Sequence, residues 1–478
     1  MQAFECSGQW WLPDKEKECT AGTLKVSESG DLRLWLLGSL RPAETFESKI
    51  CPVILGWVDK RPFGHFVNVD DIVTLSGCML GGSTVGSATN SPRENYHASR
   101  AYFGAHLTKE QEFTFKSMSL RLAGLSEWSH NYSGFVAEQF PAGKPDEPKP
   151  VLSYASQNPL VANVPDGQLT LAVGIGSHLT HRERSFRESV GFDISCETAK
   201  TSDQFNAEYV YPLQNLMTFV SDRPQAVEEF SVRAGELPMN LAGTDIRVIG
   251  PRVQPEEEGG VSEPVHFFQM LFTLADVDFA EFIGKWLRVT ARYQDACSVF
   301  FGLQYGPPAY LDLAFPSVVQ SLYLYYSRRE DAVATRVEEE RRLKDILAAL
   351  PVTDADWIVD RLGGQPFPPL HIVLRELVGE HSNTMNPLVS SRQDRFVNEV
   401  INTLKYSMFR EADMELAARH GADLYWMMLK LRFLFKSCML RELGFNIEKI
   451  TELFQRNGLY NHVCGIESAE EIRLSCSM

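Results

Sequence analysis

An arginine and a histidine near the C-terminal end of the chain have the residue types and the spacing for cutting RNA without a metal ion. Arg456 and His462 are separated by five residues, and Asn457 directly follows the arginine. A guanidinium can hold the scissile phosphate and stabilise its developing charge, and an imidazole can move the proton of the 2′-hydroxyl or of the leaving oxygen. A sequence pattern with only two fixed positions also arises often by chance. In the alternative interpretation Arg456 favours the C-terminal end of a helix because of the helix dipole, and His462 lies in a tail loop.

Two other motifs match a binding site only in part. The glycines of residues 77–86 have the spacing of a phosphate-binding loop, but Ser83 stands where such a loop needs lysine, and the surroundings are β-like. We interpret this stretch as a loop between strands. His178, His181 and Glu183 could be three metal ligands, but no second cluster accompanies them, so polar surface residues after a strand are the simpler interpretation. We therefore expect neither a metal nor a cofactor.

The length and composition indicate a multidomain globular protein. At 478 residues the chain exceeds what one hydrophobic core usually serves, so we expect two or three domains. The net charge of -16 is spread through mixed-sign sequence, so an RNA partner would need a local basic patch. Nine cysteines without a CxxC pair are typical of reduced thiols. The N-terminus has no signal-peptide pattern and no apolar run approaches about 18 residues, so we expect a cytoplasmic protein without membrane contact.

The first 250 residues have the alternating pattern of antiparallel strands. Residues 24–26 and 32–36 alternate apolar and polar side chains on either side of the turn at 28–30, which predicts a hairpin. Similar alternation returns at 113–122 and 169–175, so we expect a sandwich-like or curled β domain over residues 1–250, with one helix at 205–220. We interpret four tryptophans as the aromatic core of this domain: Trp10, Trp11, Trp35 and Trp57.

The remaining chain changes to a helical pattern after a linker. Residues 251–264 contain three consecutive glutamates, two glycines and three prolines, which is typical of a linker. Residues 265–478 then predict an α-helical bundle, so the fold class is α+β. The longest helix, 422–443, carries an apolar stripe, and we expect it to pair with 395–409 as antiparallel helices. Further helices are expected at 279–293, 315–327, 332–350, 354–362, 370–381 and 447–456.

The whole chain resembles the ApeA-type HEPN proteins of bacterial anti-phage defence. In the N-terminal half the resemblance rests on residues 8–13 and 22–24, and it continues through 73–128. In the C-terminal half it rests on the runs 421–425, 430–432 and 441–445. We find no acid–base or nucleophile constellation in the β domain, so by analogy with the family we expect it to sense or bind an infection signal. The resemblance also implies a HEPN domain that dimerises through its long helices.

The resemblance also implies an RNA-cleaving effector that shuts down translation, but the family's catalytic run is altered. The family has an arginine and a histidine in a T-R-N-Y-x-x-H-like run just before the long helix, and here Leu404 and Phe409 stand at these two positions, with Lys405 after Leu404. Neither side chain can hold a phosphate or carry a proton. Either Arg456 and His462 supply a relocated site, since their spacing matches the R-x(4–6)-H pattern of metal-independent HEPN ribonucleases, or the HEPN copy is catalytically silent.

We therefore expect an abortive-infection effector, a homodimeric HEPN-type endoribonuclease that acts on cellular RNA such as tRNA and whose β domain senses a phage protein. Arg456, Asn457 and His462 are its candidate catalytic residues. The alternative is a silent HEPN scaffold that binds RNA or a protein partner and senses infection without cleaving. Positive charge for RNA would come from four residues near the long helix: Lys405, Lys430, Arg432 and Lys436.

Overall fold

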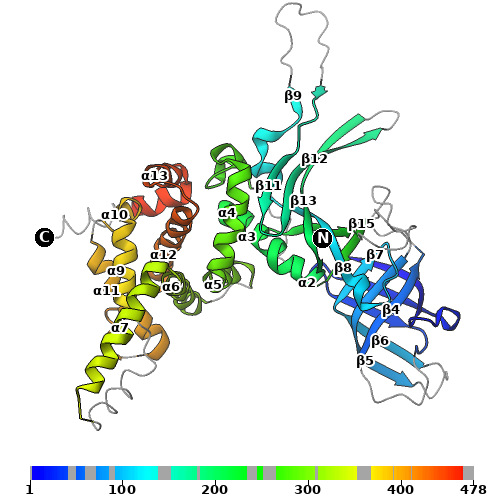
Figure 1. Ribbon diagram of the computed structural model, residues 1–478, viewed down its shortest axis with the longest axis horizontal. Helices are drawn as coiled ribbons and strands as arrows, with labels where there is room; N and C mark the ends of the chain where they lie inside the picture. The colour runs from blue at the N-terminus through cyan, green and yellow to red at the C-terminus, as the bar shows by residue number, and fades with distance from the viewer. Residues whose placement is uncertain are drawn as a thin grey trace, which may run out of the picture. The chain divides into compact units, whose positions relative to one another are not determined.

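The computed structural model shows an antiparallel β unit and an α-helical unit (Figure 1). One compact unit comprises residues 1–217, 224–255 and 273–284, and the other comprises 218–223, 256–272 and 285–478. The linker expected at 251–264 lies outside the described residues, so the boundary placed there stays a prediction. The structure describes residues 3–40, 50–59, 72–85, 92–137, 152–179, 184–233, 245–250, 265–306, 310–351, 368–390, 392–410 and 412–466.

Six strands of the β unit close into a barrel. Each strand pairs antiparallel with the next in the order β5-β4-β1-β2-β3-β6, and β6 returns to pair with the second half of β5. The hairpin expected from the alternation at 24–36 is confirmed, because β2 pairs with β3 from Gly22–Leu36 to Val26–Leu32. The strands are β1 (Phe4–Trp11), β2 (Thr20–Val26), β3 (Leu32–Leu36), β4 (Ile50–Val58), β5 (Ile72–Val85) and β6 (Pro92–Ala98).

Residues 77–85 belong to strand β5 and not to a loop, so that expectation was wrong. Gly77 has φ +62 and lies where β5 passes from one neighbour, β7, to another, β6. At Gly81 a Cβ atom would lie 2.4 Å from Oδ1 of Asn95, so a larger residue there would require the Asn95 side chain to move. The glycines thus allow one long strand to bend and pair with different partners.

Alternation along the strands fills the barrel with apolar side chains and leaves the polar ones outside. Trp10 lies inside together with Leu24, Leu34 and Ile54. Trp11 is also buried, but in a separate cluster. Trp35 and Trp57 are 38% and 44% exposed, so the expectation that all four tryptophans form the core was wrong for these two. Both tryptophans occupy strand positions whose side chains point away from the barrel interior. This follows from the alternation of side chains along a strand and not from the residue type.

The same sheet continues beyond the barrel as an open antiparallel part. From the barrel edge the order is β7-β15-β14-β8-β13-β12-β11. His178 lies in β12, whereas His181 and Glu183 lie outside the described residues. The bounds are β7 (Arg100–Phe103), β8 (Thr114–Leu122), β11 (Leu160–Val164), β12 (Gly167–Leu179), β13 (Arg184–Thr201), β14 (Val227–Arg233) and β15 (Asp245–Ile249), with a separate pair β9 (Phe135–Ala137) and β10 (Leu152–Tyr154).

Helices account for most of the chain from residue 279 onwards. The helix expected at 205–220 is present as α2 (Ser202–Phe205), a π-helical turn (Asn206–Val210) and α3 (Tyr211–Ser221). The helix expected at 354–362 lies outside the described residues. No described helix combines the length and the apolar character needed to cross a membrane. The others are α1 (Leu125–Trp128), α4 (Phe279–Arg292), α5 (Gln294–Tyr305), α6 (Leu311–Ser327), α7 (Glu330–Ala348), α9 (Leu370–Glu380), α10 (Ser382–Val389), α11 (Gln393–Phe409), α12 (Gly421–Glu442) and α13 (Ile447–Arg456), and residues 458–466 are also helical.

Helix α12 is the centre of the helical unit. Its side chains are buried almost continuously from Met427 to Leu440, and not only along the expected stripe. It packs chiefly against α6 and α10, and Phe435 stacks on Phe300 of α5 with ring centres 4.1 Å apart. Helix α11 packs chiefly against α9 and α6, so the expected pairing of 395–409 with the long helix was wrong. The stripe on α12 is covered by helices of the same chain and is not a free dimer surface.

Candidate functional site

The Arg456 to His462 string spans a joint between two helices. Helix α13 ends at Arg456, because Asn457 leaves the helical conformation with φ -80 and ψ 119. The Oδ1 atom of Asn457 accepts a hydrogen bond from the backbone N–H of Tyr460 at 3.0 Å, which caps the helical residues 458–466. Asn457 is buried. Its contacts are those of a helix cap, so they give it a structural role in holding this joint.

Arg456 and His462 each have a contact of their own. The Arg456 guanidinium is paired with the Glu452 carboxylate one turn earlier in α13. The exposed His462 ring meets Trp426 of α12 edge to face, with ring centres 5.6 Å apart. These contacts involve different residues on different helices. They do not assemble the two candidate groups around one position.

The altered family run forms the last two turns of α11. Leu404 is half-buried and Lys405 is exposed. Phe409 is the last residue of the helix and is 68% exposed, and Met408 beside it is also exposed. Apolar side chains therefore stand at the end of α11, at the positions where the resemblance implies the family's catalytic pair.

A second arginine and a second histidine meet on Tyr406 in the same part of α11. The Cζ atom of Arg410 lies 5.1 Å from the centre of the Tyr406 ring. The His420 ring is also 5.1 Å from that centre, edge to face at 85°. The guanidinium and the imidazole are therefore no further apart than the sum of these two distances. Both groups are exposed at the surface and are therefore accessible to an RNA ligand.

The backbone holds Arg410 in place. It adopts the left-handed conformation with φ 52 at the C-terminal cap of α11, and its N–H donates to the Tyr406 carbonyl at 2.9 Å. Its guanidinium donates to the Asp312 carboxylate at 3.2 Å. Hydrogen bonds to Asp312 and Tyr406 raise the pKa of Arg410, so the group is cationic at every physiological pH. Sequence reasoning missed this cluster, although Arg410 directly follows Phe409 of the altered run.

The four cations expected to contact RNA lie in different environments. Lys405 is exposed, and Lys430 is half-buried. Arg432 donates to the Gln304 side chain at 3.1 Å and lies 3.6 Å from the Asp222 carboxylate. Lys436 is only 1% exposed, and its ammonium pairs with Asp222 and donates to the Phe219 carbonyl at 3.0 Å. Burial lowers the pKa of Lys436 and Asp222 opposes that effect, so Lys436 serves the interior and does not fit a role in RNA contact.

A buried polar network fixes the helical residues that carry His462. His381 Nδ1 and Ser437 Oγ of α12 lie 2.8 Å apart, and Ser437 is 3.2 Å from the hydroxyl of Thr384. The Tyr460 hydroxyl donates to the Thr384 carbonyl at 2.6 Å. Burial, with a contribution from the nearby Arg441 charge, lowers the pKa of His381 to about 4. His381 is therefore neutral at physiological pH and acts as a structural group.

Two family models match the chain, one in its N-terminal part and one in its C-terminal part. The model described as ApeA N-terminal domain 1 matches residues 5–286, more than half of the chain. The model described as Apea-like HEPN matches residues 317–449. Comparison with curated proteins and with solved structures finds no match. The second match includes Tyr406, Arg410 and His420 but ends before Arg456.

Proposed function

The chain belongs to the ApeA-type HEPN proteins of anti-phage defence, and from this premise we propose that it is a metal-independent endoribonuclease of the cytoplasm. One observation carries the proposal. A guanidinium and an imidazole contact the same tyrosine ring at the end of α11, beside the two positions that have lost the family's catalytic residues. Arg410 and His420 would therefore take over these roles. Arg456 and His462 are the second candidate pair.

The proposed reaction uses each group for one task. The 2′-hydroxyl attacks the adjacent phosphorus and gives up its proton, a P–O bond forms to the 2′-oxygen, and the bond to the 5′-oxygen breaks. His420 would move the proton from the attacking to the leaving oxygen, either directly or through solvent. Arg410 would neutralise the charge that grows on the phosphate oxygens. The products would be a 2′,3′-cyclic phosphate and a 5′-hydroxyl end.

The substrate in this proposal is a cellular RNA such as tRNA, whose loss would stop translation in an infected cell. The β unit would sense a phage protein and control the helical unit. Within the described residues it holds no cluster of three or more His, Cys, Asp or Glu side chains arranged for a metal. Trp35 and Trp57 are exposed on the strands of the β unit, and the Lys25 ammonium lies 5.4 Å from the Trp35 ring centre, which suits binding.

We propose a homodimer, with its interface at the ends of α6 and α11 instead of along α12. Asp312 of α6 and Arg410 after α11 join these two ends by an ion pair. Tyr310, Leu313, Met408 and Phe409 lie next to that pair in sequence and are exposed, and together they are the apolar α6/α11 end. An apolar surface of this kind is typical of a contact between protein copies.

A silent scaffold is the second candidate function, and Leu404 and Phe409 favour it. A half-buried leucine and an exposed phenylalanine at the family's catalytic positions suit association with RNA or a protein partner, but not proton transfer. In that case the chain would bind and sense without cleaving.

RNA cleavage in EDTA distinguishes these possibilities. We expect Arg410→Ala and His420→Ala each to lose about 100-fold or more in cleavage rate, and Arg456→Ala and His462→Ala to retain it. Arg375→Ala is a matched control, because Arg375 is 58% exposed with a carboxylate partner at 2.9 Å, and Arg410 is 59% exposed with its partner at 3.2 Å. Loss in the Arg456 and His462 variants instead would identify the later pair as the site. A dimeric wild type that cuts no RNA after infection would support the scaffold.

A further inference from the structure

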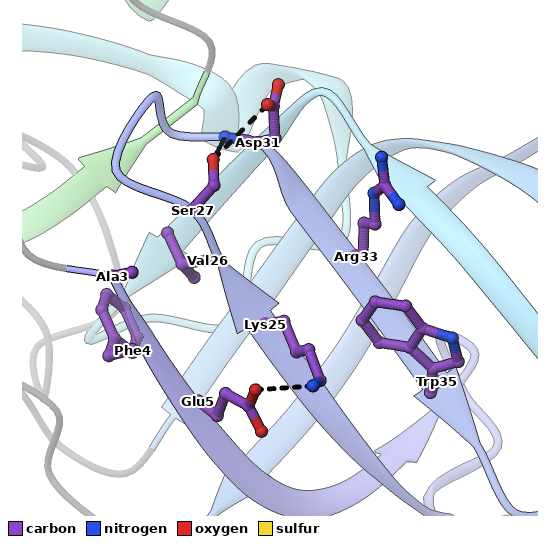
Figure 2. Close-up of a pocket in the computed structure, with 9 residues that line it drawn as sticks. All are labelled: Ala3, Phe4, Glu5, Lys25, Val26, Ser27, Asp31, Arg33 and Trp35. Atoms are coloured by element: carbon purple, nitrogen blue, oxygen red, sulfur yellow. Dashed lines mark hydrogen bonds and ion pairs between the residues drawn. The ribbon is translucent and has the colours of Figure 1, made fainter. Parts of the chain in front are cut away.

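The outer face of strands β1, β2 and β3 contains a pocket with an exposed indole and two cations (Figure 2). Its volume is about 400 Å³, and the side chains that matter here are Phe4, Glu5, Lys25, Asp31, Arg33 and Trp35. We propose that this pocket binds a nucleotide, either free or within a single strand, with the base on Trp35 and the phosphate between Arg33 and Lys25.

The strand register places the charges in one row. Glu5 of β1 lies opposite Lys25 of β2, Lys25 lies opposite Arg33 of β3, and Arg33 lies opposite His97 of β6. Like charges directly opposite each other on neighbouring strands destabilise a sheet. Lys25 and Arg33 are such a pair. Glu5 offsets the charge of Lys25, but the residues directly opposite Arg33 are Lys25 and His97, so an anionic ligand beside Arg33 would stabilise this end of the row.

The carboxylates in the pocket leave part of this charge available. Glu5 pairs with Lys25 at 2.6 Å. Asp31 is turned toward its own hairpin turn, where its carboxylate accepts from the Ser29 hydroxyl at 2.8 Å and its backbone N–H donates to Ser27. Among the residues that the structure describes, no carboxylate lies within ion-pair distance of Arg33. The lining therefore carries two cations and two carboxylates, and Arg33 is the cation whose charge stays open to a phosphate.

Trp35 supplies the surface for a base. Its indole is 38% exposed, and the Lys25 ammonium lies 5.4 Å from the ring centre. Trp35 and Arg33 are two residues apart on one strand and therefore point to the same face (Figure 2). Phe4 adds apolar surface at the edge of the pocket. A flat aromatic base on an exposed indole, with its phosphate on a neighbouring guanidinium, is how proteins bind single strands without reading their sequence.

Binding of a fluorescent hexanucleotide of 2′-O-methyl RNA, which cannot be cleaved through its 2′-oxygen, tests the inference in the full-length protein. We expect Trp35→Ala and Arg33→Ala each to weaken binding about tenfold, as for loss of one stacked base. Trp57→Ala is the matched control for aromatic exposure, since Trp57 is 44% exposed on β4 outside this pocket. Lys17→Ala controls for the loss of one exposed positive charge from the β unit.

Competition identifies the source of the nucleotide. If unlabelled AMP or ATP displaces the labelled strand, and this displacement depends on Trp35 and Arg33, the pocket binds a free nucleotide. If only the strand binds and both variants weaken it, the pocket takes a nucleotide within a single strand. The inference is overturned if the two variants bind as wild type does, if Trp57→Ala weakens binding equally, or if a polyglutamate peptide binds the pocket and nucleotides do not. Cleavage in EDTA does not enter these readouts, so the outcome is independent of the proposed ribonuclease.

Discussion

His381 gives the helical unit a stability that depends on pH. Its side chain is buried between α9 and α10 and contacts Ser437 of α12. Burial lowers its pKa to about 4, whereas a histidine in an unfolded chain has a pKa of about 6.5. Below about pH 6.5 the unfolded chain therefore binds a proton that the folded chain does not bind. The contribution of His381 to stability is present above that pH and is lost as the pH falls toward 4.

The size of the effect follows from this difference in pKa. A difference of one pKa unit corresponds to about 1.4 kcal/mol. Protonation of this residue alone should therefore lower the free energy of unfolding by about 2 kcal/mol between about pH 7 and about pH 5. His381→Gln cannot titrate and should lose this part of the dependence. Urea unfolding followed by far-ultraviolet circular dichroism, at both pH values for both proteins, measures the difference. If the free energy of unfolding falls equally for wild type and His381→Gln on acidification, the conclusion that His381 is buried in its neutral form is refuted.

Three further experiments test the packing and the association of the helical unit. Phe435→Ala should lower the free energy of unfolding by about 3–5 kcal/mol in urea, because it leaves a cavity against Phe300. Lys436→Met should destabilise by about 3 kcal/mol because Asp222 loses its buried partner, and adding Asp222→Asn should recover most of that loss in the same assay. Phe409→Asp should shift sedimentation from dimer to monomer by placing a charge in the apolar α6/α11 end, whereas an unchanged dimer would exclude that surface.

The sequence predicts local elements well where one pattern dominates. The hairpin of β2 and β3 follows from strict alternation around a short turn, and both strands are present. Most of the expected helices are also present because each carries a clear helical period. The closure of the barrel is different. It depends on β5 meeting both β4 and β6, a pairing of segments far apart in sequence that no local pattern specifies.

The prediction for α12 was wrong for the same reason: a local pattern does not specify which helices pack against it. An apolar stripe of Leu424, Met427 and Leu431 shows that one face is buried, but not what buries it. We expected Lys436 to contact RNA, but Lys436 and the neighbouring Ser437 are both buried and have partners inside the protein, Asp222 for the lysine and His381 for the serine. Burial of polar groups is allowed once they are paired, so sequence polarity alone cannot mark the surface of such a helix.

The candidate site shows the same limit for catalytic motifs. A fixed spacing finds Arg456 and His462, which lie on either side of a helix joint. Arg410 and His420 are separated by nine residues that contain a turn, and only the fold brings both to Tyr406. A search for one helical spacing therefore passes over them.

The end of α11 links the two proposals for the helical unit. Phe409 lies in the apolar α6/α11 end, and the next residue, Arg410, turns the chain through its left-handed conformation and contacts Tyr406. If two copies meet over Phe409, the Arg410 and His420 groups of each copy lie beside the interface, so one RNA would meet cations from both. Phe409→Asp should then lower cleavage together with dimerisation while leaving the Arg410 and Asp312 ion pair in place. A monomeric Phe409→Asp variant that cuts RNA at the wild-type rate would separate the two functions and show that one copy contains the whole site.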